Sequence, residues 1–283
     1  MHVAQPHKTP LCFLFDNGSL RPAATLSLRK TASQLATMLG TEVRAVSLLH
    51  SSAIDPSELG GQPAQLLEPA LNCFLQGNPA CEVVLAPLFF GPSGALTDYV
   101  PDRLAALTRK FPQARLRLGG CLVDIDEPDD RIAQALVEAV RRVISERKLS
   151  LPKVVLVDHG SPQRAVTEVR NFLGRQVQAL LAGLVDALAV ASMEKRPGAE
   201  FTFNDPLLAE RLRTPPFDEG DVVVALQFLS PGRHAGPGGD VATICAEASR
   251  EKPNLHTYLA DTIANDPRVV AVLADRYRQA LQS

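Results

Sequence analysis

The sequence predicts an α/β protein made of two copies of one unit, and three observations lead to that prediction. The chain has 283 residues, long for one domain but suited to two of about 140. Short apolar runs alternate with longer helical stretches, the pattern of parallel sheets flanked by helices. The two halves also resemble each other, which indicates an internal duplication. We therefore expect two α/β domains, at residues 1–148 and 149–283.

The duplication is visible as matched segments that keep their order along the chain. Residues 11–19 match 153–161 at a spacing of 142, residues 46–50 match 190–194 at 144, and residues 83–84 match 222–223 at 139. Such order at a nearly constant spacing is not expected by chance. Pro152 ends the short polar linker Arg147–Pro152, because proline stops the preceding helix before the next strand.

Each half is expected to contain four strands and four helices. Runs such as KVVLV and DVVVAL are continuously apolar, as in parallel strands covered on both faces. In the first half the expected strands are Leu11–Phe15, Glu42–Leu48, Glu82–Phe90 and Arg115–Leu118, and the helices Ala23–Leu39, Gln62–Gln76, Asp102–Phe111 and Asp129–Arg147. In the second half the strands are Lys153–Val157, Asp186–Ala191, Asp221–Leu229 and Asn254–Leu259, and the helices Gln163–Leu184, Pro206–Arg213, Asp240–Glu251 and Asp266–Leu281.

Composition excludes several classes of protein. Lys and Arg number 29 against 31 Asp and Glu, and aromatic residues make up 5% with no Trp, so a nucleic-acid or membrane-surface module is not expected. The N-terminal residues lack the pattern of a signal peptide, and no apolar run reaches the ~18 residues of a membrane span. Five scattered cysteines without a Cys-x-x-Cys pair indicate reduced thiols. A cytoplasmic protein is the expectation.

Three side chains of the second half lie just after predicted strands. His159, Glu194 and His234 follow its first three strands. Ligands of open α/β sheets bind outside the carboxyl ends of the strands. Imidazole and carboxylate groups together suit Zn²⁺, Co²⁺, Ni²⁺ or Fe²⁺ and leave coordination positions open. These three residues therefore form a candidate metal site.

The first half lacks most of this set. At the positions of His159, Glu194 and His234 it is expected to carry Asn17, His50 and Ala95. His50, the expected mirror of Glu194, is interpreted as a relic, although the sequence leaves open whether it contributes to the site. His256 lies within the last predicted strand and is interpreted as structural, while His2 and His7 belong to the N-terminal segment.

The motifs around these residues resemble those of the sirohydrochlorin chelatases, a family of class II tetrapyrrole chelatases. The motifs are Asp158-His159-Gly160-Ser161, Met193-Glu194 and Ser230-Pro231-Gly232-Arg233-His234, with Pro87-Leu88-Phe89-Phe90 and Asp98-Tyr99-Val100-Pro101 in the first half. The resemblance implies two chelatase-like domains, the first degenerate and the second carrying the metal site. It also implies ATP-independent insertion of Co²⁺ or Fe²⁺, cobalt slightly favoured, into sirohydrochlorin for cobalamin or siroheme synthesis.

Roles of individual residues follow from the resemblance. His159 and His234 would hold the metal ion and take protons from the pyrrole nitrogens, and Glu194 would be a third ligand or proton acceptor. The substrate carries carboxylates, so cations near the strand ends would orient it. The candidate substrate-binding residues are Ser161, Arg164, Lys195, Arg196 and Arg233. No nucleotide is expected, because the sequence has no phosphate-binding loop of the Gly-x-x-x-x-Gly-Lys type.

Two alternatives stay open at this point. Decay of the ligand set in the first half is compatible with a non-catalytic metal or tetrapyrrole carrier. A hydrolase or phosphatase using Asp158, His159 and Ser161 is disfavoured, because consecutive strand residues face opposite sides and there is no Gly-x-Ser-x-Gly elbow. The sequence identifies neither the physiological metal nor the oligomeric state, whether monomer or homodimer. The loop 232–239 is interpreted as a flexible lid over a large flat ligand.

Overall fold

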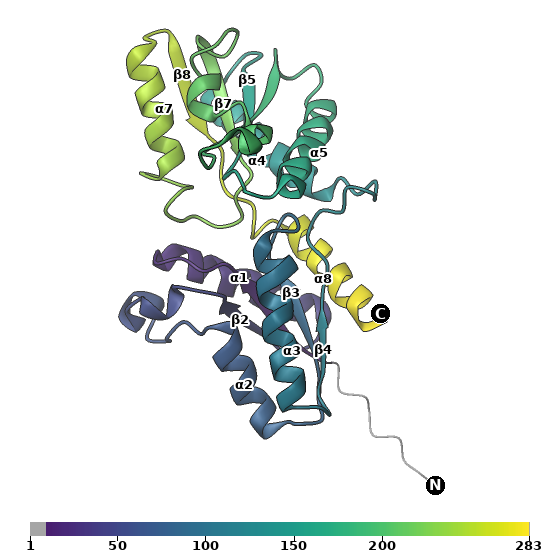
Figure 1. The fold of residues 1–283 in the computed structure, drawn as a ribbon. Coiled ribbons are helices and arrows are strands. Elements are labelled where there is room, and N and C mark those ends of the chain that lie inside the picture. The colour runs from purple at the N-terminus through teal and green to yellow at the C-terminus, as the bar shows by residue number, and fades with distance from the viewer. Residues whose placement is uncertain (1–9, 283) are drawn as a thin grey trace. The chain divides into compact units, whose positions relative to one another are not determined.

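Each half of the chain contains a four-stranded parallel sheet flanked by helices, in a computed structural model that describes residues 10–282 (Figure 1). The first half contains β1 (Leu11–Asp16), α1 (Pro22–Leu39), β2 (Val43–Ser47), α2 (Leu67–Gly77), β3 (Glu82–Pro87), α3 (Val100–Lys110), β4 (Arg115–Leu118) and α4 (Arg131–Arg147). The second contains β5 (Lys153–Asp158), α5 (Arg164–Leu180), β6 (Leu188–Ser192), α6 (Leu208–Arg211), β7 (Gly220–Leu226), α7 (Asp240–Glu251), β8 (Leu255–Leu259) and α8 (Pro267–Gln282). The predicted fold class is confirmed.

The strand order is the same in both sheets. It runs β2-β1-β3-β4 in the first and β6-β5-β7-β8 in the second, and every pair is parallel. Five consecutive residues are buried in each of β1 and β5, so both faces of these strands are covered. Identical order and burial in the two halves are what a duplicated unit would give.

Two helices differ from their expected bounds, both at the same place in the repeat. The expected helix 62–76 begins only at Leu67, after the short 3₁₀ turns Ser51–Ala53 and Pro56–Leu59. The expected helix 206–213 is reduced to the four residues Leu208–Arg211. Leu66 and Leu207, the residues before these helices, are extended and form parallel bridges with Ser47 and Ser192, which delays both helix starts.

The compact units of the protein do not divide the chain at residue 148. Within the described residues, unit 1 comprises residues 10–88, 95–120 and 270–282, and unit 2 comprises residues 89–94 and 121–269. Helix α4 therefore belongs to unit 2, where it packs on α5 and β7, and most of α8 belongs to unit 1. In unit 1 the hydroxyl of Tyr277, on α8, donates a hydrogen bond of 2.5 Å to the carbonyl of Pro10. Each unit thus contains a helix encoded in the other half of the sequence.

Other expectations can be checked within the described residues. No helix between residues 10 and 282 combines the length and the apolar character needed to cross a bilayer. All five cysteines are free thiols, and burial raises the pKa of Cys12 and of Cys245 to about 12. His2 and His7 lie outside the residues that the structure describes.

Candidate metal-binding site

The strand ends of unit 2 bring His159 and Glu194 side by side. The backbone N–H of Glu194 donates a hydrogen bond to the carbonyl of His159 at 3.2 Å. Gly160, the residue between them in space, has φ of +89°, and a Cβ there would lie 1.9 Å from the carbonyl oxygen of Glu194. Only glycine allows so close an approach. The backbone therefore fixes how the first two candidate ligands are placed.

His234 comes from the loop that connects β7 to α7. That loop is closed on itself and on the helix, because Gly232 N–H donates to Ala235 O at 2.8 Å and Val241 N–H donates to His234 O at 3.1 Å. The N–H of Asp240 donates to the carbonyl of Arg233, also at 3.1 Å. These bonds anchor the segment around His234 to the first turn of α7, so the helix holds this part of the loop in place.

The three candidate ligands converge at one place in unit 2. The rings of His159 and His234 meet edge to face with their centroids 4.6 Å apart and an interplanar angle of 82°. The Nε2 atom of His159 lies 3.6 Å from Oε1 of Glu194. Their side chains are 45%, 32% and 62% exposed for His159, His234 and Glu194. His159 is thus the central member, in reach of solvent and of both partners.

The arrangement is not a closed metal centre. Within residues 10–282, no group of three or more His, Cys, Asp or Glu side chains is arranged so that it could hold a metal ion. Structural metal sites are closed and four-coordinate, whereas catalytic metal sites keep a coordination position open. His159, His234 and Glu194 thus lie close together without forming a preassembled metal site.

Hydrogen bonds determine which ring nitrogen of each histidine is available. His159 Nδ1 lies 3.0 Å from the carbonyl oxygen of Gly160, and His234 Nδ1 lies 2.7 Å from Oδ2 of Asp240. Both oxygens only accept, so each Nδ1 carries the hydrogen and donates it. Nε2 of each neutral ring then keeps its lone pair for a metal ion or a proton.

A buried charged network lies behind these strand ends. Asp158, the last residue of β5, accepts a hydrogen bond of 2.6 Å from the hydroxyl of Ser192, the last residue of β6. Arg170 of α5, only 1% exposed, donates to Ser192 Oγ at 2.6 Å and to the carbonyl of Asn204 at 2.8 Å. Its guanidinium lies 3.9 Å from the Asp158 carboxylate. The buried Arg170 side chain therefore joins the ends of β5 and β6.

Burial and neighbouring groups act on Asp158 in opposite directions. Burial raises its pKa above the ordinary value, while the Ser192 hydroxyl and the positive charge of Arg170 act to lower it. Burial also lowers the pKa of Arg170, against the attraction of Asp158. Each group thus favours the charged form of the other and opposes the effect of burial.

Asn204 ties the loop after β5 to the same network. Its side-chain oxygen accepts from the backbone N–H of Ser161 at 2.9 Å, and its amide donates to the Ser161 carbonyl at 2.9 Å. The Ser161 hydroxyl accepts from the N–H of Gln163 at 3.0 Å. In the described part of the chain no hydrogen bond joins Ser161 to His159, which further disfavours a serine nucleophile.

The predicted substrate-binding cations differ in their surroundings. Lys195 is engaged with Asp205, its Nζ lying 2.5 and 2.8 Å from the two carboxylate oxygens. Arg164 is exposed and lies 4.8 Å over the ring of Phe203. Arg196 and Arg233 are exposed as well, and Arg233 is 77% so. The three arginines are thus accessible to an anionic ligand, although Arg233 also lies 3.7 Å from Asp240, whereas Lys195 is only partly exposed and is held by Asp205.

Unit 1 shows that His50 is not the counterpart of Glu194. Asp16 pairs with Ser47 across β1 and β2 as Asp158 pairs with Ser192 across β5 and β6, so the spacing at this strand is 145 and not 144. Leu49 N–H donates to the Asn17 carbonyl at 3.0 Å, the bond that Glu194 makes to His159. Leu49 therefore stands at the position of Glu194, and the expectation for His50 was wrong by one residue.

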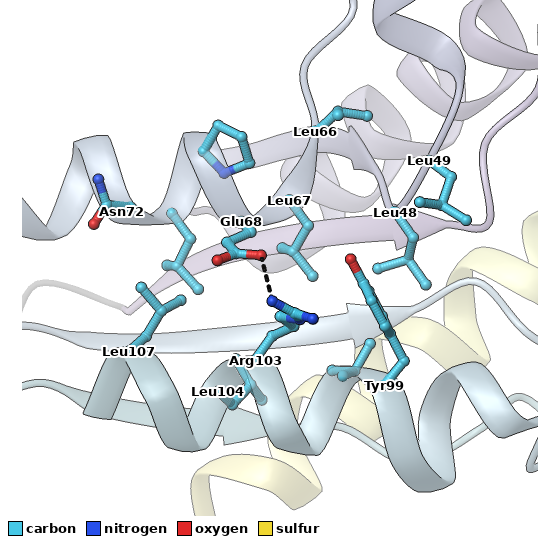
Figure 2. A pocket seen from close by; sticks show the side chains of 13 residues that line it. Leu48, Leu49, Leu66, Leu67, Glu68, Asn72, Tyr99, Arg103, Leu104 and Leu107 are labelled. Atoms are coloured by element: carbon cyan, nitrogen blue, oxygen red, sulfur yellow. Dashed lines mark ion pairs between the residues drawn. The ribbon is translucent and has the colours of Figure 1, made fainter. Parts of the chain in front are cut away.

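Unit 1 contains an apolar cavity of about 360 Å³ between α2 and α3 (Figure 2). Its walls are mainly leucines, with Tyr99 beside the end of β2, and the Glu68 and Arg103 side chains pair across it at 3.8 Å. In unit 2 the corresponding elements are packed into a core cluster that includes Leu208 and Phe217. The unit without the His159 and His234 pair thus has open space between α2 and α3.

Three buried or partly buried residues of the site were not predicted from the sequence. Arg170 and Asn204 hold the strand ends, and Asp240 holds His234. Arg170 did give a signal, because it lies on the buried face of α5 between Thr167 and Leu173, where an apolar residue is expected. Asn204 and Asp240 gave none, since their partners are defined only by the folded loops.

Comparison with known proteins was made for both sequence and structure. Residues 153–280 match the model of the CbiX family. Among curated proteins no sequence match was found. SirB from Bacillus subtilis with Fe³⁺ superposes with a TM-score of 0.65 at 14% identity, over 96% of this chain and 95% of that chain. The sirohydrochlorin chelatase SirB from Bacillus subtilis subspecies spizizenii in complex with cobalt gives 0.65 at 15%, over 96% of both chains. CbiX, described as the terminal enzyme for biosynthesis of siroheme in denitrifying bacteria, gives 0.59 at 16%, over 96% of this chain and 99% of that one.

Proposed function

We propose that this chain, whose residues 153–280 match the CbiX family model, is a chelatase of that family that inserts Co²⁺ or Fe²⁺ into sirohydrochlorin without ATP. The observation that carries the proposal is the contact of His159 with both His234 and Glu194 at the strand ends of unit 2. The structures of SirB and CbiX, which share the fold, support the proposal. The reaction would take place in the cytoplasm, as the composition predicts.

Metal insertion has two requirements that these side chains meet. The ion must lose bound water, and the macrocycle must lose the protons of two pyrrole N–H groups. Nε2 of His159 and of His234 can replace water on the ion, because both rings hold their hydrogen on Nδ1. The Glu194 carboxylate, 62% exposed and 3.6 Å from His159, supplies a further ligand or a proton acceptor. Four macrocycle nitrogens would then take over the ion.

The accessible cations would orient the carboxylates of the macrocycle. Arg164, Arg196 and Arg233 are exposed on unit 2, and guanidinium groups bind carboxylates with two parallel hydrogen bonds. Lys195 would have to leave Asp205 to take part. Ser161 would contribute by shaping the turn after β5, since its hydroxyl accepts from Gln163 N–H.

The test is an anaerobic insertion assay with the purified full-length protein. Co²⁺ and Fe²⁺ are offered in parallel, and the absorbance change of sirohydrochlorin reports metal insertion. We expect His159→Ala to lower the rate at least about 100-fold, toward the spontaneous rate, as loss of a central acid–base group does. His256→Ala is the matched control, because His256 is an exposed residue of β8.

The same assay distinguishes the second candidate. Loss of the ligand set in unit 1 favours a carrier, which would bind Co²⁺ or the tetrapyrrole without accelerating insertion. A wild-type rate equal to the spontaneous one, with binding retained, would leave only the carrier. Unchanged insertion by His159→Ala would refute the assignment of this site.

A further inference from the structure

We propose that Asp240 is a positioning residue that fixes the orientation and tautomer of His234. The inference rests on the proposed function of the site, but it concerns a residue that the sequence motifs did not single out. Its carboxylate Oδ2 lies 2.7 Å from His234 Nδ1, the length of a charge-assisted hydrogen bond. A carboxylate only accepts, so it selects the form of the ring with hydrogen on Nδ1 and the lone pair on Nε2.

The position of Asp240 in the fold keeps its carboxylate in place. It is the first residue of α7, where the helix N-terminus favours a negative charge. Its own N–H donates to the Arg233 carbonyl, and the next N–H, of Val241, donates to the His234 carbonyl. Nε of Arg233 lies 3.7 Å from the same Oδ2 atom. Backbone and side chain of Asp240 are thus both tied to the segment that carries His234.

The two histidines are held by different kinds of group. His159 donates from Nδ1 to the carbonyl of the adjacent Gly160, a neutral acceptor that no side-chain substitution removes. His234 depends on a charged side chain six residues away in the sequence. A change at Asp240 should therefore disturb one of the two rings and leave the hydrogen bond of the other intact.

Unit 1 supports the functional link between the two residues. Residues of β3 and β7 correspond at a spacing of 139, whereas residues of β4 and β8 correspond at a spacing of 141. The connection that contains His234 is therefore two residues longer than its counterpart in unit 1. At the spacing of 141 the buried Val100 corresponds to the buried Val241, which places Tyr99 at the position of Asp240. Where the first copy lacks the histidine, it lacks the carboxylate as well.

The experiment substitutes Asp240 by Asn, with Glu247→Gln as the matched control. Glu247 is an exposed acid on the same helix, so the control makes the same chemical change away from the site. An amide can donate to Nδ1, which would move the ring hydrogen to Nε2 and block the lone pair. We expect Asp240→Asn to lower kcat for insertion and the affinity for Co²⁺ alone by about 10- to 100-fold. Asp240→Glu should restore part of the loss, and Glu247→Gln should match wild type.

Long-range ¹H–¹⁵N NMR spectra of the histidine rings give a readout that a merely structural role would not move. Wild type should show His234 with hydrogen on Nδ1, and Asp240→Asn should shift it toward Nε2 while His159 is unchanged. Retention of the Nδ1–H form together with wild-type Co²⁺ affinity would overturn the proposal. If the wild-type protein inserts no metal, the proposed function fails, yet the NMR and Co²⁺ measurements still decide the role of Asp240.

Discussion

The first strand of each unit ends in the same backbone but in different side-chain chemistry. Asp16 and Asp158 both end their strands beside a serine of the neighbouring strand, Ser47 or Ser192. In both units a glycine follows two residues later with φ of +87° or +89°, and a Cβ there would lie within 2 Å of a carbonyl oxygen. The same backbone arrangement occurs in unit 1 without the histidines, so by itself it is not evidence of a site.

What unit 1 lacks is the charged network behind the frame. At the spacing of 142 that relates β1 to β5, Leu28 stands where Arg170 stands in unit 2, and it is 1% exposed. The next residue, Arg29, instead donates to the carbonyls of Leu59, Gln62 and Pro63 at 2.9, 2.8 and 3.1 Å. A backbone loop is therefore held by an arginine in both units, but only in unit 2 does that arginine also reach the strand ends.

The largest effect is expected from copying the unit 1 residue into unit 2. Arg170→Leu would leave Asp158 buried without its guanidinium, and breaking a buried pair in this way lowers the free energy of unfolding by about 3–5 kcal/mol. Hydrogen exchange of β5 and β6 amides would measure the loss within unit 2. Arg175→Leu, an exposed arginine of the same helix, should stay within about 0.5 kcal/mol of wild type.

A double variant that removes both charges tests whether the unpaired carboxylate causes the loss of stability. Asp158→Asn added to Arg170→Leu should recover part of the lost stability, because no uncompensated charge remains. A single Arg170→Leu variant as stable as Arg175→Leu would show that the buried guanidinium contributes nothing.

The prediction of the fold from sequence succeeded where the pattern is local. Continuously apolar runs placed β1 and β5 within one residue of their bounds, because a strand covered on both faces needs apolar residues throughout. The sequence did not predict that α4 packs in unit 2 and most of α8 in unit 1, because the apolar face of a helix does not indicate which sheet it covers.

The prediction of the site was limited by register and by buried partners. His159 was placed correctly at a strand end because it directly follows an apolar run. His50 was aligned with Glu194 because a shift of one residue between loops cannot be seen without the pairing of β1 with β2 and of β5 with β6. A shift of one residue changes which side chain faces the site, and Leu49 was missed for that reason.

An effect of intermediate size is expected from substitution of Asp16, the strand-end carboxylate of unit 1, where Leu28 stands in place of Arg170. Burial raises the pKa of Asp16 from 3.8 to about 6, opposed by the Ser47 hydroxyl. The fold therefore prefers the protonated acid, whose stabilisation is complete below about pH 4 and is lost as the pH rises through about 6. Asp16→Asn should raise the stability of unit 1 at pH 7.5 by up to about 3 kcal/mol and change it little at pH 4.

Unfolding in urea as a function of pH measures this difference, and Asp158→Asn is its matched comparison. That substitution removes the partner of Arg170, so it should destabilise unit 2 at pH 7.5. Equal effects of Asp16→Asn and Asp158→Asn on stability would contradict the inference that Arg170 makes these two strand ends differ.

The smallest effect is expected from filling the cavity of unit 1. Leu104, on α3, lines the space between α2 and α3, and at the spacing of 141 its counterpart is Cys245, which is part of the unit 2 core cluster. Leu104→Phe should add apolar contacts within the cavity of about 360 Å³ and raise the free energy of unfolding by about 1 kcal/mol. Leu104→Ala, which enlarges the space, should lower it, and metal insertion should be unaffected by either. A lower stability of Leu104→Phe would mean that the walls cannot accept the ring, and that the open space is maintained by rigid packing of α2 and α3.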